Sequence, residues 1–350
     1  MIFVLSRMRK RVTAVSNIMD IIAKETNGKS YKTFKYTYEG SDVLSFAYDD
    51  HQEITWERYG ETVPPNGSIN LKRKADSIAN DKPLFGFFLD GSRHTYKVAS
   101  QSDWNKKVFF ANLCKKLNEE SYLETIDIQF TDVIPYATKV DEFERIEGKG
   151  IAVIQDLMIQ REVAMVTKLV AEHKINNRRY LLKDGSLEYR VDHLRNDREK
   201  RQFQKNFSFV VGVSKSFNPE NCKDKKGKNN SNMIADLPLY HRTPVSMYSS
   251  PRLEGMRYAV WYLRIRDKRY TTNTFDGILK IEKILVTDEQ IHNGLETEEV
   301  DLISANIINE RNPVCYGADS RWANHLYPVY VTECFAKSKY LSDTMFLNLF

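Results

Sequence analysis

Apolar and polar positions along the chain predict strands first and an alternation of strands and helices later. An apolar run, Leu84–Leu89, stops at Asp90, and the alternating segment HTYKVA and the run KVFFANL follow as expected strands. Later strands are expected at Tyr180–Lys183, at Phe207–Val213, in YAVWYLRI and in ILKIEKI. This order predicts an α/β fold, with a mixed β-sheet flanked by helices.

The clearest helix is expected over residues 151–173, where apolar residues recur at helical spacing. One stripe of this helix contains Ile151, Ile154, Met158, Glu162, Met165 and Leu169. Glu162 is its only ionisable member, and a buried carboxylate is costly unless it meets a cation or hydrogen-bonding partners. A position at the edge of the stripe, or a salt bridge to a neighbouring basic residue, is the alternative explanation. Other helices are expected over residues 1–30, in HLRNDREKRQFQK, from about residue 287 and from near Pro328.

The chain divides into an expected N-terminal lead-in, residues 1–80, and a main domain, residues 81–350. The lead-in combines a helix with short strands at Phe34–Tyr38 and Val43–Tyr48, packed on the main domain. Residues 218–232 contain almost nothing apolar and predict a basic, flexible loop.

Composition excludes some classes of protein. With 350 residues, 41% of them hydrophobic, the chain can bury a core, and its net charge of +5 permits contact with nucleic acid without requiring it. Four cysteines without a C-x-x-C pair make a zinc site or disulfide framework unexpected and favour a reducing compartment. No apolar run approaches ~18 residues, so we expect no membrane span and a cytoplasmic protein.

Two apolar runs end in the same triplet, Asp-Gly-Ser, at Asp90 and at Asp184. Asp-Gly is a strong hairpin signal, so two ordinary turns are one explanation. Both runs are continuous, however, as in strands covered on both faces, and such strands would hold the two carboxylates rigidly at the rim of a sheet. With Glu162 they would form an oxygen cluster that suits Mg²⁺ or Mn²⁺ rather than zinc. Two such ions can activate water and stabilise the leaving oxygen of a phosphodiester.

The ordered set of motifs resembles the NurA nucleases. The set comprises the strand ending in Asp-Gly-Ser, the helix with its glutamate, DGSL, FVVGVSKSF, YAVWYLRI, ILKIEKI and YPVYVTECFAKS, within residues 84–343. The resemblance implies a ribonuclease-H-like mixed sheet flanked by helices, with N-terminal and C-terminal helical additions. It also implies a metal-dependent deoxyribonuclease that uses Mn²⁺ or Mg²⁺ in a two-metal carboxylate site. The residues that it implies are Asp90, Glu162 and Asp184 as metal ligands, Lys215 on a phosphate, and Tyr327 in the catalytic site.

The resemblance further implies a HerA-like hexameric ATPase as partner, a homodimer, and a role in anti-phage defence or DNA end processing. The chain contains no G-x-x-x-x-G-K-[ST] loop, so ATP-driven motion must come from a partner. One departure is on the terminal helix, where Phe335 takes the place of the family's histidine; His325 precedes that helix and is expected to be exposed. This departure leaves open a catalytically impaired adaptor that binds DNA or the ATPase ring. An enzyme that acts on RNA or a hybrid is a third possibility.

Basic residues beside aromatic ones favour a path for single-stranded DNA, through phosphate contacts and base stacking. Besides Lys215, the expected DNA contacts are Arg178, Arg179, Arg252, Arg257 and Arg264. A solvated sheet edge protected by charged side chains is the alternative explanation.

Overall fold

The computed structural model describes residues 30–32, 54–55, 58–101, 105–119, 123–139, 146–188, 197–219, 222–223, 231–249, 255–271, 273–312 and 320–337. The expected helix within residues 1–30 and the expected strands at 34–38 and 43–48 lie outside this set, as does most of the expected loop 218–232. No described helix is long and apolar enough to cross a membrane.

A 12-stranded mixed sheet dominates the fold, with the main order β3-β12-β13-β14-β9-β8-β5-β6-β7. Its strands are β1 (Ser30–Lys32), β3 (Arg58–Tyr59), β4 (Ile69–Asn70), β5 (Phe85–Gln101), β6 (Asn105–Glu119), β7 (Leu123–Lys139), β8 (Tyr180–Asp184), β9 (Val210–Ser214), β11 (His241–Arg242), β12 (Ser246–Ser249), β13 (Arg257–Arg264) and β14 (Ile278–Leu285). Strands β5, β8 and β9 pair in parallel, while β5-β6-β7 and β9-β14-β13 pair antiparallel. The expected α/β class with a mixed sheet is therefore confirmed.

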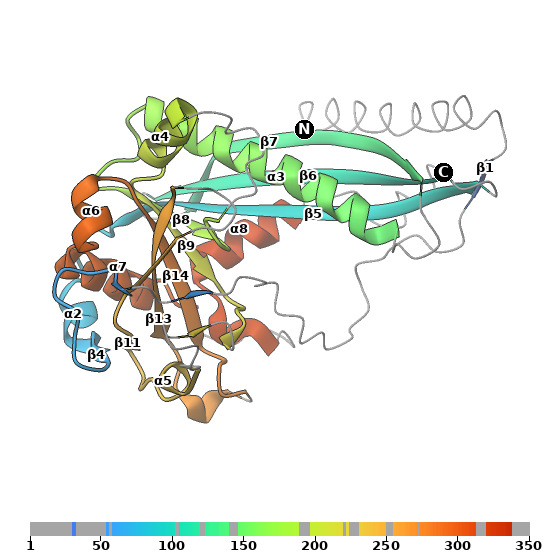
Figure 1. Ribbon diagram of the computed structural model, residues 1–350. Helices are drawn as coiled ribbons and strands as arrows, with labels where there is room; N and C mark the ends of the chain where they lie inside the picture. The colour runs from blue at the N-terminus through green and yellow to red at the C-terminus, as the bar shows by residue number, and fades with distance from the viewer. Residues whose placement is uncertain are drawn as a thin grey trace.

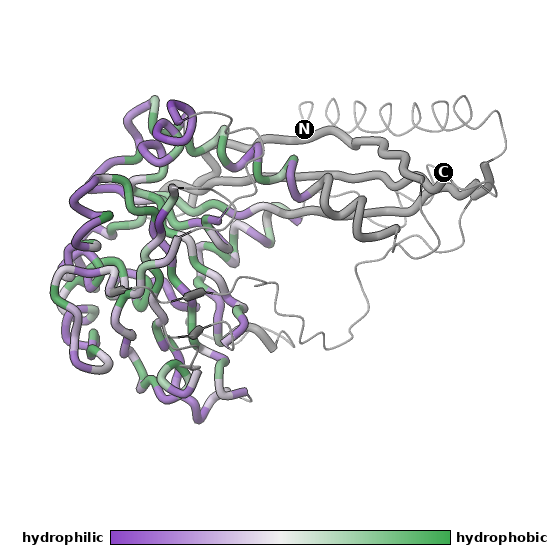
Figure 2. Tube along the Cα trace, in the orientation of Figure 1, coloured by the Kyte–Doolittle hydropathy of each residue, from purple (hydrophilic) through white to green (hydrophobic). Residues whose placement is uncertain are grey.

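Helices cover both faces of this sheet. They are α2 (Lys72–Ser77), α3 (Ile146–Ala171), α4 (Asp197–Asn206), α5 (Ser231–Ala235), α6 (Asp288–Asn293), α7 (Thr297–Asn309) and α8 (Tyr327–Lys337), with short 3-10 helices η2 (Lys268–Tyr270) and η3 (Ser320–Asn324). Strands β5, β6 and β7 extend together beyond the globular part, and α3 lies along them (Figure 1). Hydrophobic residues gather inside the globular part, whereas α4 at its margin is strongly hydrophilic (Figure 2).

Two hydrophobic cores, one on each face, follow from the alternation of side chains along the strands. On one face, Phe87 and Leu89 of β5 pack with Met165 and Leu169 of α3. On the other face, Phe88 packs in a core that includes residues of α7 and α8. The strand ends between these two layers are therefore held rigidly from both sides.

The prediction that a strand ends at the first Asp-Gly-Ser is wrong. Strand β5 continues through Asp90 and Gly91 to Gln101, with Asp90 opposite Lys115 of β6. The second triplet does leave its strand: β8 ends at Asp184, and Gly185 has a φ of 87°, which favours glycine. Identical triplets thus adopt different conformations because only the first has a partner strand, β6, along its whole length.

Other elements differ from expectation in extent. The 17-residue strand β7, which contains IDIQF, is not among the expected strands. The single helix expected from about residue 287 is two helices, α6 and α7, separated at Gly294, whose φ is 83°. Within the expected loop 218–232, Cys222–Lys223 forms β10 and pairs with β2 (Ile54–Thr55), and α5 begins at Ser231.

Candidate metal centre

Asp90 and Asp184 lie side by side on neighbouring parallel strands. Leu89 of β5 pairs with Lys183 of β8, so the next residue on each strand is an aspartate at the same level. Neighbouring strands are ~4.8 Å apart, which brings the two carboxyl groups within reach of one ion. The two identical triplets therefore do converge on one place.

A third carboxylate, Glu333, reaches the same place from α8. Asp90, Asp184 and Glu333 each offer an oxygen atom, and the three oxygen atoms lie within 4.8 Å of one another. The sequence prediction missed Glu333, although the signal that singled out Glu162 was present. Glu333 is a partly buried acid on a helical face that also carries the buried residues Val329, Thr332 and Ala336.

The ammonium group of Lys215 lies among these carboxylates. Its Nζ is 2.8 Å from Asp184 Oδ2 and 3.5 Å from Glu333 Oε2. Lys215 follows β9, the next strand along the sheet, so it approaches from the side opposite β5. Burial by itself would lower the pKa of Lys215, but the carboxylates of Asp184, Asp90 and Glu333 raise this pKa above its usual value. Lys215 is therefore a fixed cation that partly neutralises the cluster.

Glu162 reaches the cluster from the other face of the sheet. It is buried on α3, and its Oε2 lies 3.4 Å from Nζ of Lys183. Gly91 makes room for it: a Cβ at Gly91 would stand 2.6 Å from Glu162 Oε1 and equally close to the sulfur of Met158. The expected stripe on this helix is buried at Met165 and Leu169 as well. Glu162 thus lies next to Asp90 in space but has its own cation.

Burial of so many acids shifts their ionisation. Burial first, and the charge of Asp184 second, raise the pKa of Asp90 well above its usual value, whereas Lys215 lowers it. Burial also raises the pKa of Glu162, and Lys183 opposes that effect. The carboxylates interact electrostatically across the sheet, because the charge of Glu162 raises the pKa of Asp90 and the charge of Asp184 raises the pKa of Glu162. The four carboxylates form one electrostatic unit that a further cation would stabilise.

The residues present fit a hard divalent cation. Oδ2 of Asp90 is buried and has no hydrogen-bond partner within the described part of the chain. An orphaned buried carboxylate oxygen is costly unless a ligand satisfies it. All the donors are oxygen atoms, the set that Mg²⁺ and Mn²⁺ prefer and zinc does not.

A second layer of bonds fixes the backbone after Asp184. Glu282 of β14 accepts hydrogen bonds from Oγ of Ser186 at 2.7 Å and from the N–H of Leu187 at 2.8 Å, and its other oxygen lies 2.9 Å from Nζ of Lys280. Burial alone would raise the pKa of Glu282, but Lys280 and these two hydrogen bonds outweigh burial and lower it. Glu282 therefore remains ionised and holds the turn that presents Asp184.

Other residues expected at the site lie outside the carboxylate cluster. Tyr327 begins α8 with 42% of its surface exposed, six residues before Glu333, and six residues rotate a helix by about 240°, so the two side chains leave the helix on different faces. His325 is buried beside Tyr330, with ring centroids 5.2 Å apart, rather than exposed as expected. The side chain of Phe335 lies outside the described residues.

Most of the expected DNA contacts lie elsewhere. The prediction that Arg264 contacts DNA is wrong. Arg264 is 1% exposed and donates hydrogen bonds to the carbonyl oxygens of Leu237, Asp276, Ala235 and Thr274, so it cannot contact DNA without local unfolding. Arg178 and Arg179 precede β8, and Arg257 begins β13. All three are at the strand ends opposite the rim with Asp184, because β8 and β13 run in the same direction through β9 and β14. Arg252 lies outside the described residues.

Comparison with known proteins gives similarity in structure alone. No protein-family model and no curated protein matches the chain. The chain is similar to the crystal structure of the NurA nuclease from Sulfolobus solfataricus, with 10% sequence identity and a TM-score of 0.43, over 80% of this chain and 88% of that one. A second crystal structure, of NurA, gives 9% identity and a TM-score of 0.38, over 77% and 92%. Both are NurA structures. They belong to the family that the sequence motifs resemble.

Proposed function

We propose that the protein is a metal-dependent deoxyribonuclease of NurA type. The observation that carries the proposal is the convergence of Asp90, Asp184 and Glu333 within 4.8 Å, with one buried oxygen of Asp90 left without a hydrogen bond among the described residues. Oxygen clusters of this kind at a sheet rim suit phosphodiester hydrolysis, because the reaction needs charge stabilisation at a phosphate more than it needs a nucleophilic side chain.

Each residue has a role in this proposal. Asp90, Asp184 and Glu333 would hold Mn²⁺ or Mg²⁺, and Glu162 would join them from the α3 side as a ligand or as a neighbouring charge. When bound, one or two such ions activate a water molecule and stabilise the leaving oxygen of the phosphodiester. Lys215, already beside Asp184 and Glu333, would donate to a non-bridging oxygen of the phosphate.

Glu333 bears on the alternative reading as a catalytically impaired adaptor. That reading arises because Phe335 stands where the related helix carries a histidine. Glu333 lies on the same helix and would supply an oxygen ligand of its own. Three carboxylates would thus be available to hold a metal ion, which favours the enzyme over the adaptor.

Three finer proposals rest on the family resemblance. They are a HerA-like hexameric ATPase as partner, a homodimeric assembly, and a role in anti-phage defence or DNA end processing. Co-expression with such an ATPase, followed by size-exclusion chromatography with light scattering, tests the first two. Separate elution of the two proteins and a monomeric mass would contradict them.

The activity is tested on four substrates: single-stranded DNA, duplex DNA, RNA and an RNA–DNA hybrid, each with Mn²⁺, Mg²⁺ or EDTA. We expect cleavage of DNA with Mn²⁺ or Mg²⁺, none with EDTA, and a loss of more than about 100-fold in Asp184→Asn, since the ion supplies several kcal/mol of stabilisation. Glu298→Gln is the matched control, because Glu298 is 84% exposed and pairs with Lys74, which is not a residue of the cluster. Absence of metal-dependent cleavage, with and without the ATPase, would favour the alternative of a catalytically impaired adaptor. A strong preference for RNA or hybrid would change the substrate class.

A further inference from the structure

Four residues outside the carboxylate cluster form a second site with unusual charge. Cζ of Arg266 lies 5.0 Å from the ring centroid of Trp322, and Cζ of Arg311 lies 5.3 Å from that of Tyr240. The two arginines are close enough that Arg311 shifts the pKa of Arg266. We call Arg266, Arg311, Trp322 and Tyr240 the arginine site. Its members come from four segments of the chain: the end of β13, the end of α7, η3, and the turn before β11.

Arg266 contributes donors without acceptors among the described residues, whereas Nη1 of Arg311 donates to Ile308 O at 2.7 Å. Nε and Nη2 of Arg266 are buried and have no hydrogen-bond partner in the part of the chain that the structure describes. The described groups that shift the pKa of Arg266 are Arg311 and Tyr240, and no described carboxylate is among them. Burial first, and Arg311 second, lower this pKa. Two guanidinium cations held this close repel each other unless an anion joins them, and a planar guanidinium group suits a phosphate oxygen pair.

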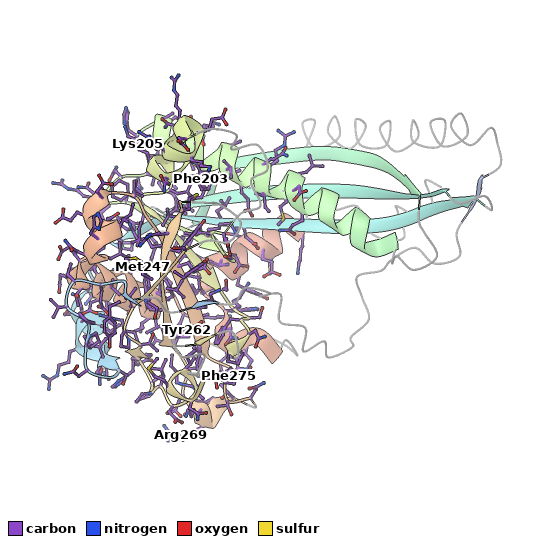
Figure 3. The ribbon with its side chains drawn as sticks, in the orientation of Figure 1. Phe203, Lys205, Met247, Tyr262, Arg269 and Phe275 are labelled. Carbon is purple, nitrogen blue, oxygen red and sulfur yellow. The ribbon has the colours of Figure 1, made fainter. Side chains whose placement is uncertain are left out.

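Contrast with the neighbouring arginines shows that this arrangement is specific. Arg269, labelled in Figure 3 at the margin of the globular part, lies 2.8 Å from Asp267 Oδ2 and is 79% exposed. Arg264 donates hydrogen bonds to four backbone carbonyl oxygens. Arg242 is bound by Glu61 and Asp301. Each of these is explained by its protein partners, whereas the buried nitrogens Nε and Nη2 of Arg266 have no such partner among the residues that the structure describes.

The arginine site lies on the same rim of the sheet as the carboxylate cluster. Arg266 follows the end of β13 that is level with the start of β14, and the N–H of Ile265 donates to Gly277 O at 2.7 Å. Asn324 accepts a hydrogen bond from the N–H of Gly277 and donates to Lys215 O at 2.7 Å. A short chain of backbone and amide bonds therefore joins Arg266 to Lys215.

Two routes give the spacing between the sites. From β13 across β14 and β9 to β8 there are three strand steps of ~4.8 Å, or ~14 Å. Along the other route, Arg311 forms a bridge with Leu326, and Glu333 lies seven residues further along α8, or ~10 Å at ~1.5 Å per residue. A stacked strand rises ~3.4 Å per nucleotide along its axis, and successive phosphates lie farther apart than this rise because the backbone winds around the axis, so the spacing corresponds to about two or three nucleotides.

We propose that the arginine site binds a backbone phosphate of the DNA strand whose cleaved phosphate lies at the carboxylate cluster, about two or three nucleotides away. The inference rests on the proposed nuclease function. Arg266 and Arg311 bind the phosphate, and Trp322 and Tyr240 hold the two guanidinium groups in place. The site positions the strand and carries no base specificity, because phosphates are the same in every sequence.

The test measures binding without cleavage. A 5′-fluorescein 20-nucleotide single strand is titrated in EDTA, by fluorescence anisotropy, at several salt concentrations. Arg266→Gln and Arg311→Gln should each lower the slope of log K against log salt by about 0.7, the value for one phosphate of a single strand, and weaken binding about fivefold at 0.1 M salt. Arg266→Lys should retain most of the affinity. Arg269→Gln, which removes the same charge from an exposed arginine, should bind as the wild type does.

Unchanged affinity and slope in folded Arg266→Gln and Arg311→Gln would overturn the inference. If Arg266→Gln fails to fold, the affinity and slope of Arg311→Gln alone test the inference, because Arg311 is only half-buried. Inorganic phosphate is the second probe: if it raises the melting temperature of the wild type but not of Arg311→Gln while the DNA affinities stay equal, the site takes free phosphate and the DNA inference fails. Because EDTA abolishes cleavage in every sample, this outcome is independent of whether the protein is a nuclease.

Discussion

The carboxylate of Glu162 is pressed against the backbone of Gly91, on the face of the sheet opposite the side chain of Asp90. A Cβ at Gly91 would stand 2.6 Å from Glu162 Oε1, closer than real Cβ contacts allow. The glycine of the first Asp-Gly-Ser therefore serves neither a turn nor a left-handed backbone conformation. It lets an acid from α3 approach the two aspartates through the plane of the sheet.

Gly91→Ala should consequently displace Glu162 and lower the affinity for Mn²⁺. We expect a loss of about 10- to 100-fold, the usual effect of disturbing groups beside a metal site, measured by isothermal titration calorimetry. Gly86→Ala is the matched control on the same strand, since its new Cβ would meet the flexible side chain of Arg179 instead. Equal affinities in the two variants would show that the position of Glu162 does not affect the ion.

Lys215 should have two separable effects. Lys215→Met removes the cation next to Asp184 and Glu333, so without metal we expect a loss of about 3 kcal/mol in the free energy of unfolding, as for a broken buried ion pair. Mn²⁺ should restore more stability to this variant than to the wild type, because the ion replaces the missing charge. Cleavage should still fall, because the phosphate loses its donor.

Urea unfolding with and without Mn²⁺ measures the first effect. Lys337→Met is the control, since Lys337 also pairs with Glu333, at 2.7 Å, but is 56% exposed and should contribute little. If Lys215→Met and Lys337→Met lose similar stability, Lys215 does not neutralise the cluster.

Asp90→Asn should stabilise the metal-free protein at neutral pH. Burial and Asp184 raise the folded-state pKa of Asp90 above its usual value of 3.8. The folded state therefore keeps a proton that the unfolded state releases, and the wild type loses stability as the pH rises from 3.8 through the folded pKa. The gain in Asp90→Asn should be present at pH 7 and should vanish near pH 3.8.

Melting temperatures between pH 3.5 and pH 8, in EDTA and in Mn²⁺, measure this gain. At an ion concentration about 100 times Kd, the wild type should gain ~2.7 kcal/mol and Asp90→Asn much less. Asp81→Asn, at an exposed aspartate, should follow the wild type throughout. A variant that is less stable than the wild type at pH 7 in EDTA would argue against a strained carboxylate at position 90.

Glu282 should have the opposite dependence on pH. Its bonds to Lys280, Ser186 and Leu187 outweigh burial and lower its folded-state pKa below the usual 4.5. Its stabilising contribution is fully present above pH 4.5 and disappears as the pH falls through the folded pKa. Glu282→Gln should therefore be less stable than the wild type by on the order of 2 kcal/mol at pH 7, and the difference should shrink at pH 3.

A second measurement distinguishes positioning from stability alone. Because Ser186 and Leu187 follow Asp184, Glu282→Gln should also weaken Mn²⁺ binding by about 10-fold at pH 7 and at a temperature where the variant is fully folded. Unchanged Mn²⁺ affinity would limit Glu282 to a structural role.

The sequence predicts the central part of this fold well, because that part depends on local patterns. Continuous apolar runs indicated β5, β8, β9, β13 and β14, and a helical stripe indicated α3 and the burial of Glu162. Glu333 shows the limit: its place in the cluster depends on how α8 packs over β5, a contact between residues more than 200 positions apart. Arg264 shows another limit. An arginine within an aromatic strand gives the same sequence pattern whether its side chain donates hydrogen bonds to backbone carbonyl oxygens or to DNA.

The most direct measurement of the central claim is anomalous X-ray diffraction from crystals soaked in MnCl₂. We predict a manganese peak bounded by carboxylate oxygens of Asp90, Asp184 and Glu333, and its absence in crystals of Asp184→Asn. A peak at another place, or no peak at a concentration that supports cleavage, would contradict the account.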